Sequence, residues 1–188
     1  MIVSSTAISG LLVIEPTVFT DERGYFFEPF NEALFKAETG LKIKFVQDNE
    51  SRSVKHALRG LHFQVPPHAQ AKLVRVVTGA VLDVAVDLRG GAPTFGQHAS
   101  IFLTAENKFQ FFIPEGFAHG FLVLEPNTVF SYKCSAPYNK EAEMALRWDD
   151  ADLGIQWGID GPILSDKDAA APLFKDFNSP FEFAEEKA

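Results

Sequence analysis

Two short segments carry most of the side chains that could do chemistry. The first holds His62, Gln64 and Lys72, and the second holds His119. A histidine is suited to take a proton near neutral pH. A lysine can stabilise negative charge that develops on a neighbouring oxygen. The two segments therefore predict proton-transfer chemistry, provided that the fold brings them to one cavity.

The same two segments resemble the two motifs of the cupin superfamily, in which three histidines and one glutamate bind a metal ion. Gln64 stands where the second histidine would be, and Lys72 stands where the glutamate would be. Only His62 and His119 remain of that ligand set. Because an ammonium group repels a divalent cation, we expect no metal at this site.

Short strands must position these residues, because the chain consists of short apolar or alternating runs cut by Gly, Pro, Asn and Asp. The pattern predicts a mainly β fold, a sandwich or jelly-roll barrel whose mouth can hold a ligand. A short helix is expected between Asn31 and Gly40, and a second one after Ser165. The predicted strands cover residues 11–15, 25–30, 44–51, 57–64, 71–78, 81–88, 98–103, 109–113, 118–124 and 127–134.

Alternation along two of these strands assigns side chains to faces. In the strand over 57–64, Arg59, Leu61 and Phe63 should share one face, and His62 and Gln64 the other, which would be the barrel interior. In the strand over 81–88, two carboxylates, at positions 83 and 87, should share a face.

Composition limits the class of protein. The 188 residues carry 17 Lys and Arg against 25 Asp and Glu, a net charge of −8, and 46% of them are hydrophobic. Nucleic-acid binders need a cationic surface, so none is expected as a partner. Residues 42–75 differ from the chain as a whole, because they carry seven cations and only two anions. This positive segment suits a small phosphorylated ligand. The length predicts one domain over 1–188, in which 169–188 form a C-terminal surface extension.

The compartment is also suggested by the sequence. Cys134 is the only cysteine, so no intrachain disulfide can form, which fits a reducing environment. The first 14 residues lack the features of a signal peptide, and no apolar run is long enough for a membrane span. We therefore expect a cytoplasmic protein that does not insert into a membrane.

Eight segments together closely resemble the dTDP-4-dehydrorhamnose 3,5-epimerase family. They include Leu-Arg-Gly-Leu-His-Phe-Gln at 58–64 and Pro-Glu-Gly-Phe-Ala-His-Gly-Phe at 114–121. The resemblance runs in order from residue 10 to about residue 170. It implies a double-stranded β-helix homodimer without metal or nicotinamide cofactor. The substrate would be a dTDP-linked 4-keto-6-deoxyhexose, dTDP-4-dehydro-6-deoxy-D-glucose, and the product dTDP-4-dehydro-L-rhamnose, on the way to dTDP-L-rhamnose.

The resemblance also assigns roles. His62 would remove the proton next to the C4 ketone, and Asp168 would orient His62. Lys72 would stabilise the enolate, together with His119, and Tyr132 would return a proton from the opposite face of the ring. The nucleotide would be held by a larger set, in which the first three members bind the diphosphate and the fourth stacks on thymine: Arg23, Arg59, Lys167, Tyr138, Glu28, Gln47, Asn49 and Glu143.

Three alternatives remain open at this stage. The enzyme could invert C3 alone or C5 alone, because one base and one acid can stop after a single inversion. It could be a metal-dependent cupin enzyme, which Gln64 and Lys72 argue against. It could be a sugar-nucleotide-binding module without catalysis, which the presence of a complete set of acid and base groups disfavours.

Overall fold

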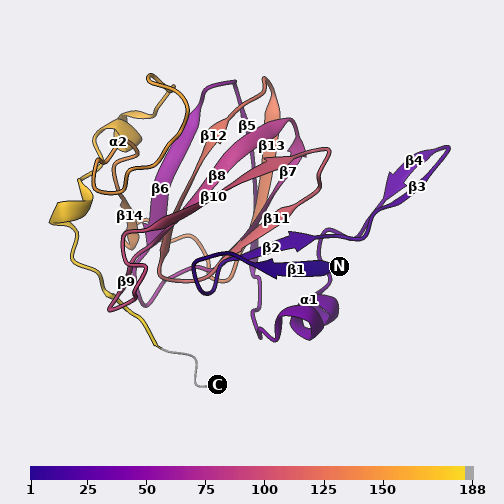
Figure 1. Cartoon of the computed structure of the whole chain (residues 1–188), viewed down its shortest axis with the longest axis horizontal. Helices are drawn as coiled ribbons and strands as arrows, with labels where there is room; N and C mark the ends of the chain where they lie inside the picture. Colours follow the sequence, from indigo (N-terminus) through magenta and orange to yellow (C-terminus); the bar gives the residue numbers. More distant parts are fainter. Residues whose placement is uncertain (185–188) are drawn as a thin grey trace.

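The computed structural model describes residues 1–184 as a mainly β structure built from two facing antiparallel sheets (Figure 1). One sheet has the order β1-β2-β11-β7-β13-β5 and the other β10-β8-β12-β6-β14. The predicted jelly-roll, cupin-like architecture with a few short helices is confirmed. The elements are β1 (Ile2–Ser5), β2 (Leu12–Glu15), β3 (Phe19–Asp21), β4 (Gly24–Phe26), α1 (Glu32–Thr39), β5 (Gln47–Ser53), β6 (Leu58–Gln64), β7 (Lys72–Thr78), β8 (Ala80–Asp87), β9 (Arg89–Gly90), β10 (His98–Thr104), β11 (Gln110–Ile113), β12 (Phe117–Val123), β13 (Thr128–Cys134), β14 (Glu143–Ala145), α2 (Asp166–Ala169), the 3-10 turn η1 (Phe174–Asp176) and β15 (Phe181–Glu182).

The core between the two sheets is aromatic and aliphatic. Phe121 of one sheet and Phe130 of the other stack with ring centroids 4.0 Å apart. Phe111, Val74 and Val81 are fully buried in the same cluster. Burying such side chains contributes about 1.5–3 kcal/mol each relative to exposure. This cluster therefore fixes how far apart the sheets lie.

The outer face of each sheet is covered by a further cluster. Phe35 of α1 packs against Leu73 and Phe112 on the first sheet. On the second sheet, Trp157 and Phe181 pack in the cluster that covers the outer face of β8. The predicted alternation of β8 is confirmed, since its 82, 84 and 86 positions lie in this outer cluster and its 81 and 85 positions in the interior.

Both helices begin where the sequence predicts. The Asn31 side chain accepts a hydrogen bond from the Leu34 amide at 3.1 Å, and α1 ends at Gly40 in the left-handed conformation. At α2, the Ser165 hydroxyl accepts from the Asp168 amide at 3.2 Å. Each cap satisfies an amide that the first turn of a helix leaves without a partner.

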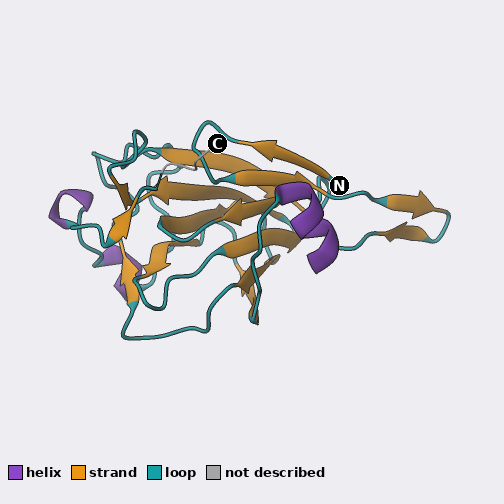
Figure 2. Ribbon diagram, turned by 90° about the horizontal axis from the view of Figure 1, so that it is seen from below, coloured by secondary structure: helices purple, strands orange, loops and turns teal. Residues whose placement is uncertain are grey.

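The strand predicted over 25–30 is instead the second half of a hairpin. β3 and β4 pair only with each other and project from the body of the molecule (Figures 1 and 2). Phe19, Tyr25 and Phe26 on this hairpin are each about 60% exposed or more. The alternation rule found the strand but could not reveal that it lacks a sheet to join.

β6 carries an irregularity that overturns one predicted orientation. Its pairing with β12 aligns His62 with His119 but Arg59 with Phe121, so β6 holds one extra residue there. Such a bulge shifts the alternation of side chains. Leu61 therefore packs in the outer cluster, whereas Arg59 reaches across to the first sheet, where its Nε donates to Ser53 Oγ at 3.1 Å. Arg59 was predicted to share a face with Leu61, and this was wrong.

Two glycines allow the bulge. Gly60 has φ +134°, and a Cβ there would lie 2.5 Å from the Gly120 Cα. Gly60→Ala is expected to lower the free energy of unfolding by about 2–4 kcal/mol, because it adds a clash to an unfavourable φ. Urea denaturation measures this. Gly161→Ala, where a Cβ meets nothing within 4 Å, is the control, and equal losses in both variants would contradict the argument.

The described part of the predicted C-terminal surface extension packs on the second sheet. β15 pairs in parallel with β9, and Phe181 is 92% buried. The Phe63 ring packs edge-on against Phe177, with centroids 5.4 Å apart. Residues 185–188, the end of the predicted extension, lie outside the described residues. No helix within residues 1–184 is long and apolar enough to cross a membrane.

Candidate active site

A cavity of about 320 Å³ opens at one end of the barrel, between the two sheets. β5, β7 and β13 of the first sheet and β6 and β14 of the second contribute to its wall. Most of the predicted catalytic and binding residues are therefore brought together. The lining residues are Gln47, Asn49, His62, Phe63, Gln64, Gln70, Lys72, Tyr132, Cys134, Tyr138 and Glu143.

His62 forms a pair with Asp168 at the cavity wall. The His62 Nε2 and the Asp168 Oδ1 are 2.5 Å apart, and the aspartate side chain is only 4% exposed. Burial alone would raise the pKa of Asp168, but hydrogen bonds from His62, Ser165 and the Gly60 amide hold it below its ordinary value. The carboxylate is therefore ionised at neutral pH. This arrangement fixes the ring of His62 and can stabilise its charged form.

Lys72 lies beside His62 with little compensation for its charge. Its Nζ donates to the His62 carbonyl oxygen at 3.4 Å, a long contact. Burial lowers the pKa of Lys72, and the nearby carboxylates of Asp83 and Glu143 oppose this effect. A buried ammonium without a close acidic partner is suited to receive an anion.

Tyr132 stands on the opposite sheet from His62. It lies on β13, directly paired with Asn49 of β5, and its ring lines the cavity. Burial raises the pKa of Tyr132, and the Arg59 guanidinium opposes the shift. The phenol is therefore protonated at neutral pH and can donate a proton.

His119 lies deeper in the barrel than the sequence suggests. Its side chain is 7% exposed, and its Nε2 lies 3.0 Å from both carboxylate oxygens of Asp83. Burial lowers the pKa of His119 and raises that of Asp83, while the two groups partly offset each other. His119 is not among the residues that line the cavity. The pair can act on the site through Lys72, whose charge contributes to both pKa shifts.

Groups predicted to bind nucleotide form a network at the mouth of the cavity. Glu143 Oε2 accepts the Tyr138 hydroxyl at 2.8 Å and the Lys167 ammonium at 2.5 Å. The Tyr138 amide donates to Gln47 Oε1 at 2.9 Å, and the Gln47 side-chain amide donates to Asn49 Oδ1 at 3.0 Å. The predicted residues are thus linked to one another.

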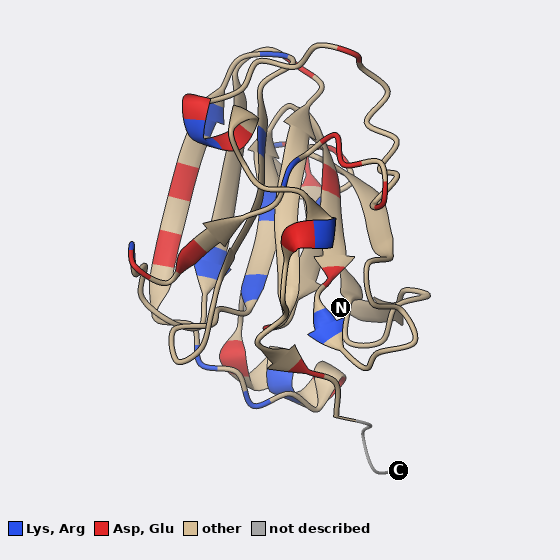
Figure 3. Ribbon diagram, turned by 90° about the vertical axis from the view of Figure 1, so that its left-hand side faces the viewer, with Lys and Arg blue, Asp and Glu red and all other residues tan. Residues whose placement is uncertain are grey.

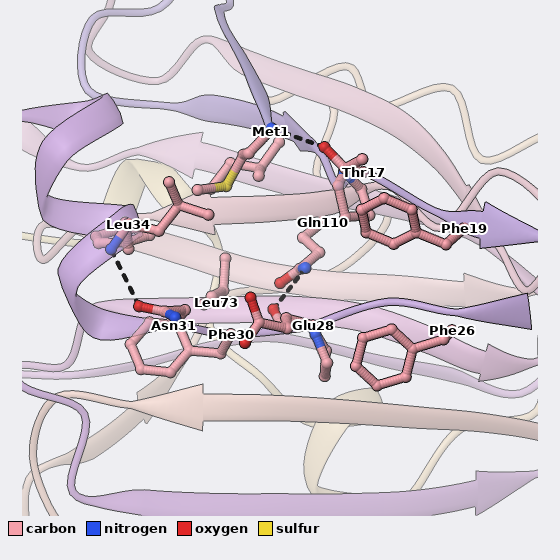
Figure 4. A pocket seen from close by; sticks show the side chains of 14 residues that line it. Met1, Thr17, Phe19, Phe26, Glu28, Phe30, Asn31, Leu34, Leu73 and Gln110 are labelled. Carbon is pink, nitrogen blue, oxygen red and sulfur yellow. Dashed lines mark hydrogen bonds between the residues drawn. The ribbon is translucent and has the colours of Figure 1, made fainter.

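Six of the predicted residues do not line this cavity, and two of them, Arg23 and Glu28, line other pockets of the chain. Arg23 lies at the tip of the hairpin, 88% exposed, and pairs with Asp21. Glu28 lines a different, mainly apolar pocket of about 220 Å³ between the base of the hairpin and α1 (Figure 4). There the Gln110 side-chain amide donates to the Pro29 carbonyl, and Glu28 lies beside them. The sequence order alone could not reveal this separation.

The structure adds residues that sequence reasoning did not single out. Ser53 holds Arg59, and the Cys134 thiol accepts a hydrogen bond from Asn49 at 3.6 Å. Burial raises the pKa of Cys134, so the thiol is neutral. The signal for Ser53 was its alternation with Gln47 and Asn49 on β5.

The described residues also show where the cationic side chains lie and whether metal ligands are grouped. Lys and Arg lie on strands of the barrel as well as on its loops (Figure 3). Within residues 1–184, no three His, Cys, Asp or Glu side chains are grouped as a metal site. Gln64 is used structurally, since its side chain bonds the Asn139 amide at 2.8 Å and the His68 carbonyl at 2.6 Å.

The comparison with protein families decides the class. Residues 5–176 match the model of the family described as dTDP-4-dehydrorhamnose 3,5-epimerase. The chain belongs to this family. A dTDP-4-dehydrorhamnose 3,5-epimerase of Shigella flexneri is 51% identical over 176 residues, which cover 94% of this chain and 97% of the relative. The resemblance read from the motifs is confirmed.

Solved structures of family members agree with the fold. A dTDP-6-deoxy-D-glucose-3,5-epimerase from Legionella pneumophila, in complex with dTDP-4-keto-L-rhamnose, is 46% identical with a TM-score of 0.93, covering 97% of this chain and 98% of that chain. A 3'-monoepimerase from Streptomyces bikiniensis, in complex with dTDP-quinovose, is 37% identical with a TM-score of 0.85, covering 89% and 85%. Proteins described as a 3,5-epimerase and as a 3'-monoepimerase thus share this architecture.

Proposed function

We propose that this chain is an isomerase that epimerises C3 and C5 of dTDP-4-dehydro-6-deoxy-D-glucose and yields dTDP-4-dehydro-L-rhamnose. The observation that carries the proposal is that His62 and Tyr132 line one cavity from opposite sheets. The names of the family's members, with about half of their residues identical to this chain, support the same substrate class. The product is an intermediate for dTDP-L-rhamnose.

The first step is removal of a proton from a carbon next to the C4 ketone. The C–H bond there is acidic because the electron pair it leaves can move onto the ketone oxygen as an enolate. His62 takes the proton, and Asp168 at 2.5 Å stabilises the imidazolium that results. The Asp168 carboxylate keeps its charge at working pH.

The enolate oxygen needs a fixed positive group in a site with little water. Lys72 supplies it, since its ammonium lacks a close acidic partner among the described residues. His119 and Asp83 support Lys72 from the barrel interior, because their pair lies within electrostatic range of the ammonium.

Inversion requires that a proton returns to the other face of the ring. Tyr132 provides it, because its phenol is protonated and stands on the sheet opposite His62. Repeating the cycle at the second carbon inverts both centres. Stopping after one cycle would give a C3-only or C5-only epimerase, and the 3'-monoepimerase among the relatives makes the C3-only case the second candidate.

The nucleotide is assigned to the mouth of the cavity. Arg59 and Lys167 bind the diphosphate, since cationic side chains match phosphate oxygens. Tyr138 stacks on thymine, and the surrounding polar groups hold the base and sugar: Gln47, Asn49 and Glu143.

We further infer a homodimer, in which Arg23 and Glu28 serve the partner's cavity. Their own cavity is out of reach, and the hairpin that carries Arg23 exposes Phe19 and Phe26 to solvent. An exposed apolar hairpin of this kind is typical of a contact surface. Light scattering at the mass of two chains supports this, and a monomer that retains full activity contradicts it.

The chemistry asks for no metal or redox cofactor, because proton transfer alone inverts the carbon. Stoichiometric iron, manganese or zinc in the purified protein would instead indicate a metal-dependent cupin enzyme. A cytoplasmic location is proposed from the unpaired thiol of Cys134.

The test of function is solvent exchange. Incubation with the 4-keto sugar nucleotide in deuterated water should place deuterium at C3 and C5, counted by mass spectrometry. Deuterium at one carbon indicates a single epimerase. Absence of exchange by the wild-type protein would contradict the enzyme proposal. If dTDP nevertheless binds tightly, the protein is a binding module.

Asp168→Asn is expected to lower kcat about 10²–10⁴-fold, because an amide cannot compensate the imidazolium. The fold lowers the pKa of Asp168 below its ordinary value of about 3.9. The charged Asp168 carboxylate therefore stabilises the folded protein at any pH above that ordinary value, and this stabilisation is lost only as the pH falls through the lowered pKa. The loss of rate should therefore persist from pH 6 to 9. A rate-loss that disappears in this range would contradict the assigned role.

A further inference from the structure

Asp150 is a buried carboxylate that takes no part in the proposed chemistry. It is 4% exposed and does not line the cavity. Its Oδ1 accepts hydrogen bonds from the amides of Asp152 at 2.8 Å and Leu153 at 3.4 Å. Its Oδ2 accepts one from the amide of Phe174 at 2.7 Å. Removing a carboxylate from water is costly, and these backbone amides compensate for that cost.

The two oxygens of Asp150 join segments that are distant in the chain. Oδ1 closes the turn that follows β14, whereas Oδ2 holds the first residue of η1. Nearby, the Arg147 amide donates to the Pro172 carbonyl oxygen at 2.9 Å. Residues 147–150 therefore fix the chain just after α2.

α2 is suspended between this attachment and an earlier one. Before the helix, the Leu58 amide donates to the Ile163 carbonyl oxygen at 3.0 Å. Between Ile163 and Phe174 the chain carries Asp168, which lies on α2. A helix of four residues is too short to be stable by itself. The position of α2 therefore depends on the attachments at its two sides.

The pair of catalytic groups depends on where α2 lies. His62 Nε2 and Asp168 Oδ1 are 2.5 Å apart, and a displacement of about 1 Å can lower a rate about 10²-fold. We propose that Asp150 is a positioning residue, which fixes the chain after α2 and thereby places Asp168 against His62. This inference rests on the proposed function, in which His62 removes the proton.

Two substitutions sever the attachment. Asp150→Asn keeps the size of the side chain but replaces one acceptor by an NH2 donor, so the turn and the Phe174 amide cannot both be satisfied. Asp150→Ser can still accept from the amide two residues further on, but it is too short to reach Phe174. In both variants kcat, measured as deuterium entering the sugar, should fall about 10–100-fold.

A double-mutant cycle tests whether the effect passes through Asp168. In a protein that already carries Asp168→Asn, adding Asp150→Asn should lower kcat by less than about twofold. Amide hydrogen exchange gives a second readout, because the segment that contains Phe174 should exchange faster in Asp150→Asn than in the wild type.

Thr128→Val is the matched control for a general loss of stability. Thr128 is fully buried, and its hydroxyl donates to the Glu125 carbonyl oxygen at 2.8 Å. It begins β13, at the opposite end of that strand from the cavity. Thermal melts should show a loss of stability in this variant as in Asp150→Asn, but its kcat should stay within about twofold of the wild type.

Unchanged kcat in both Asp150 variants would overturn the proposal. A full further loss in the double variant would also overturn it, because the effect would then not act through Asp168. So would equal losses of kcat in Thr128→Val and Asp150→Asn, since any loss of stability would then be sufficient. Failure of the proposed function is distinct from these outcomes, because the wild-type protein would then exchange no deuterium.

Discussion

His62→Ala is expected to abolish deuterium incorporation at both C3 and C5, with a fall in rate of at least about 10³-fold. General acid–base catalysis contributes about 10²–10⁴-fold, and this variant also leaves the buried carboxylate of Asp168 without its partner. Mass spectrometry of the sugar nucleotide in deuterated water measures the effect. Affinity for dTDP should change little, since the assigned diphosphate groups lie on other side chains.

His98→Ala provides the control for the loss of a histidine. His98 lies on β10, at the edge of the second sheet and away from the cavity. Its exchange rate should match that of the wild type. Appreciable exchange by His62→Ala, within tenfold of the wild type, would show that another group removes the proton.

Tyr132→Phe is expected to separate exchange from inversion. Without the phenol no acid stands on the far side of the ring, so the proton that His62 removes can return only from His62 itself. Formation of inverted product should fall about 10²–10³-fold. Deuterium should still enter with retention of configuration, which NMR of the product distinguishes from inversion.

Tyr138→Phe is the comparison for Tyr132→Phe, because both remove one hydroxyl from the cavity wall. The Tyr138 hydroxyl contacts Glu143 and no reacting atom is assigned to it. Its loss should alter KM and leave the ratio of exchange to inversion unchanged. An equal loss of exchange and inversion in Tyr132→Phe would mean that the phenol acts before the proton is removed.

Periodicity was sufficient to predict the longer strands that carry the site. The helix caps at Asn31 and Ser165, the alternation of β8 and the cavity position of His62 follow from local rules of pattern and capping, whereas Lys72 and Tyr132 were assigned to the site by the resemblance. These rules work because each depends on neighbours in the chain. The three-residue strand β14, which supplies Glu143, was too short to give a periodic signal.

Features that depend on contacts between residues far apart in the chain could not be predicted from the sequence. The bulge that turns Arg59 toward the first sheet exists because Gly60 and Gly120 of two strands touch, a contact that no alternation rule contains. The hairpin of Arg23 was predicted as an ordinary strand, since nothing local tells whether a strand has a neighbour. The described part of the C-terminal segment is likewise held by tertiary contacts of its phenylalanines.

Because His62 lies on one sheet and Tyr132 on the other, the hydrophobic core between the sheets also determines how far apart these two residues lie. The stacked rings of Phe121 and Phe130, with centroids 4.0 Å apart, lie between the same two sheets deeper in the barrel. Their thickness therefore sets the width of the slot in which the sugar ring must fit. Stereochemical fidelity in this enzyme is in this sense a packing property, and a change of volume far from any reacting atom can alter which carbon lies between base and acid.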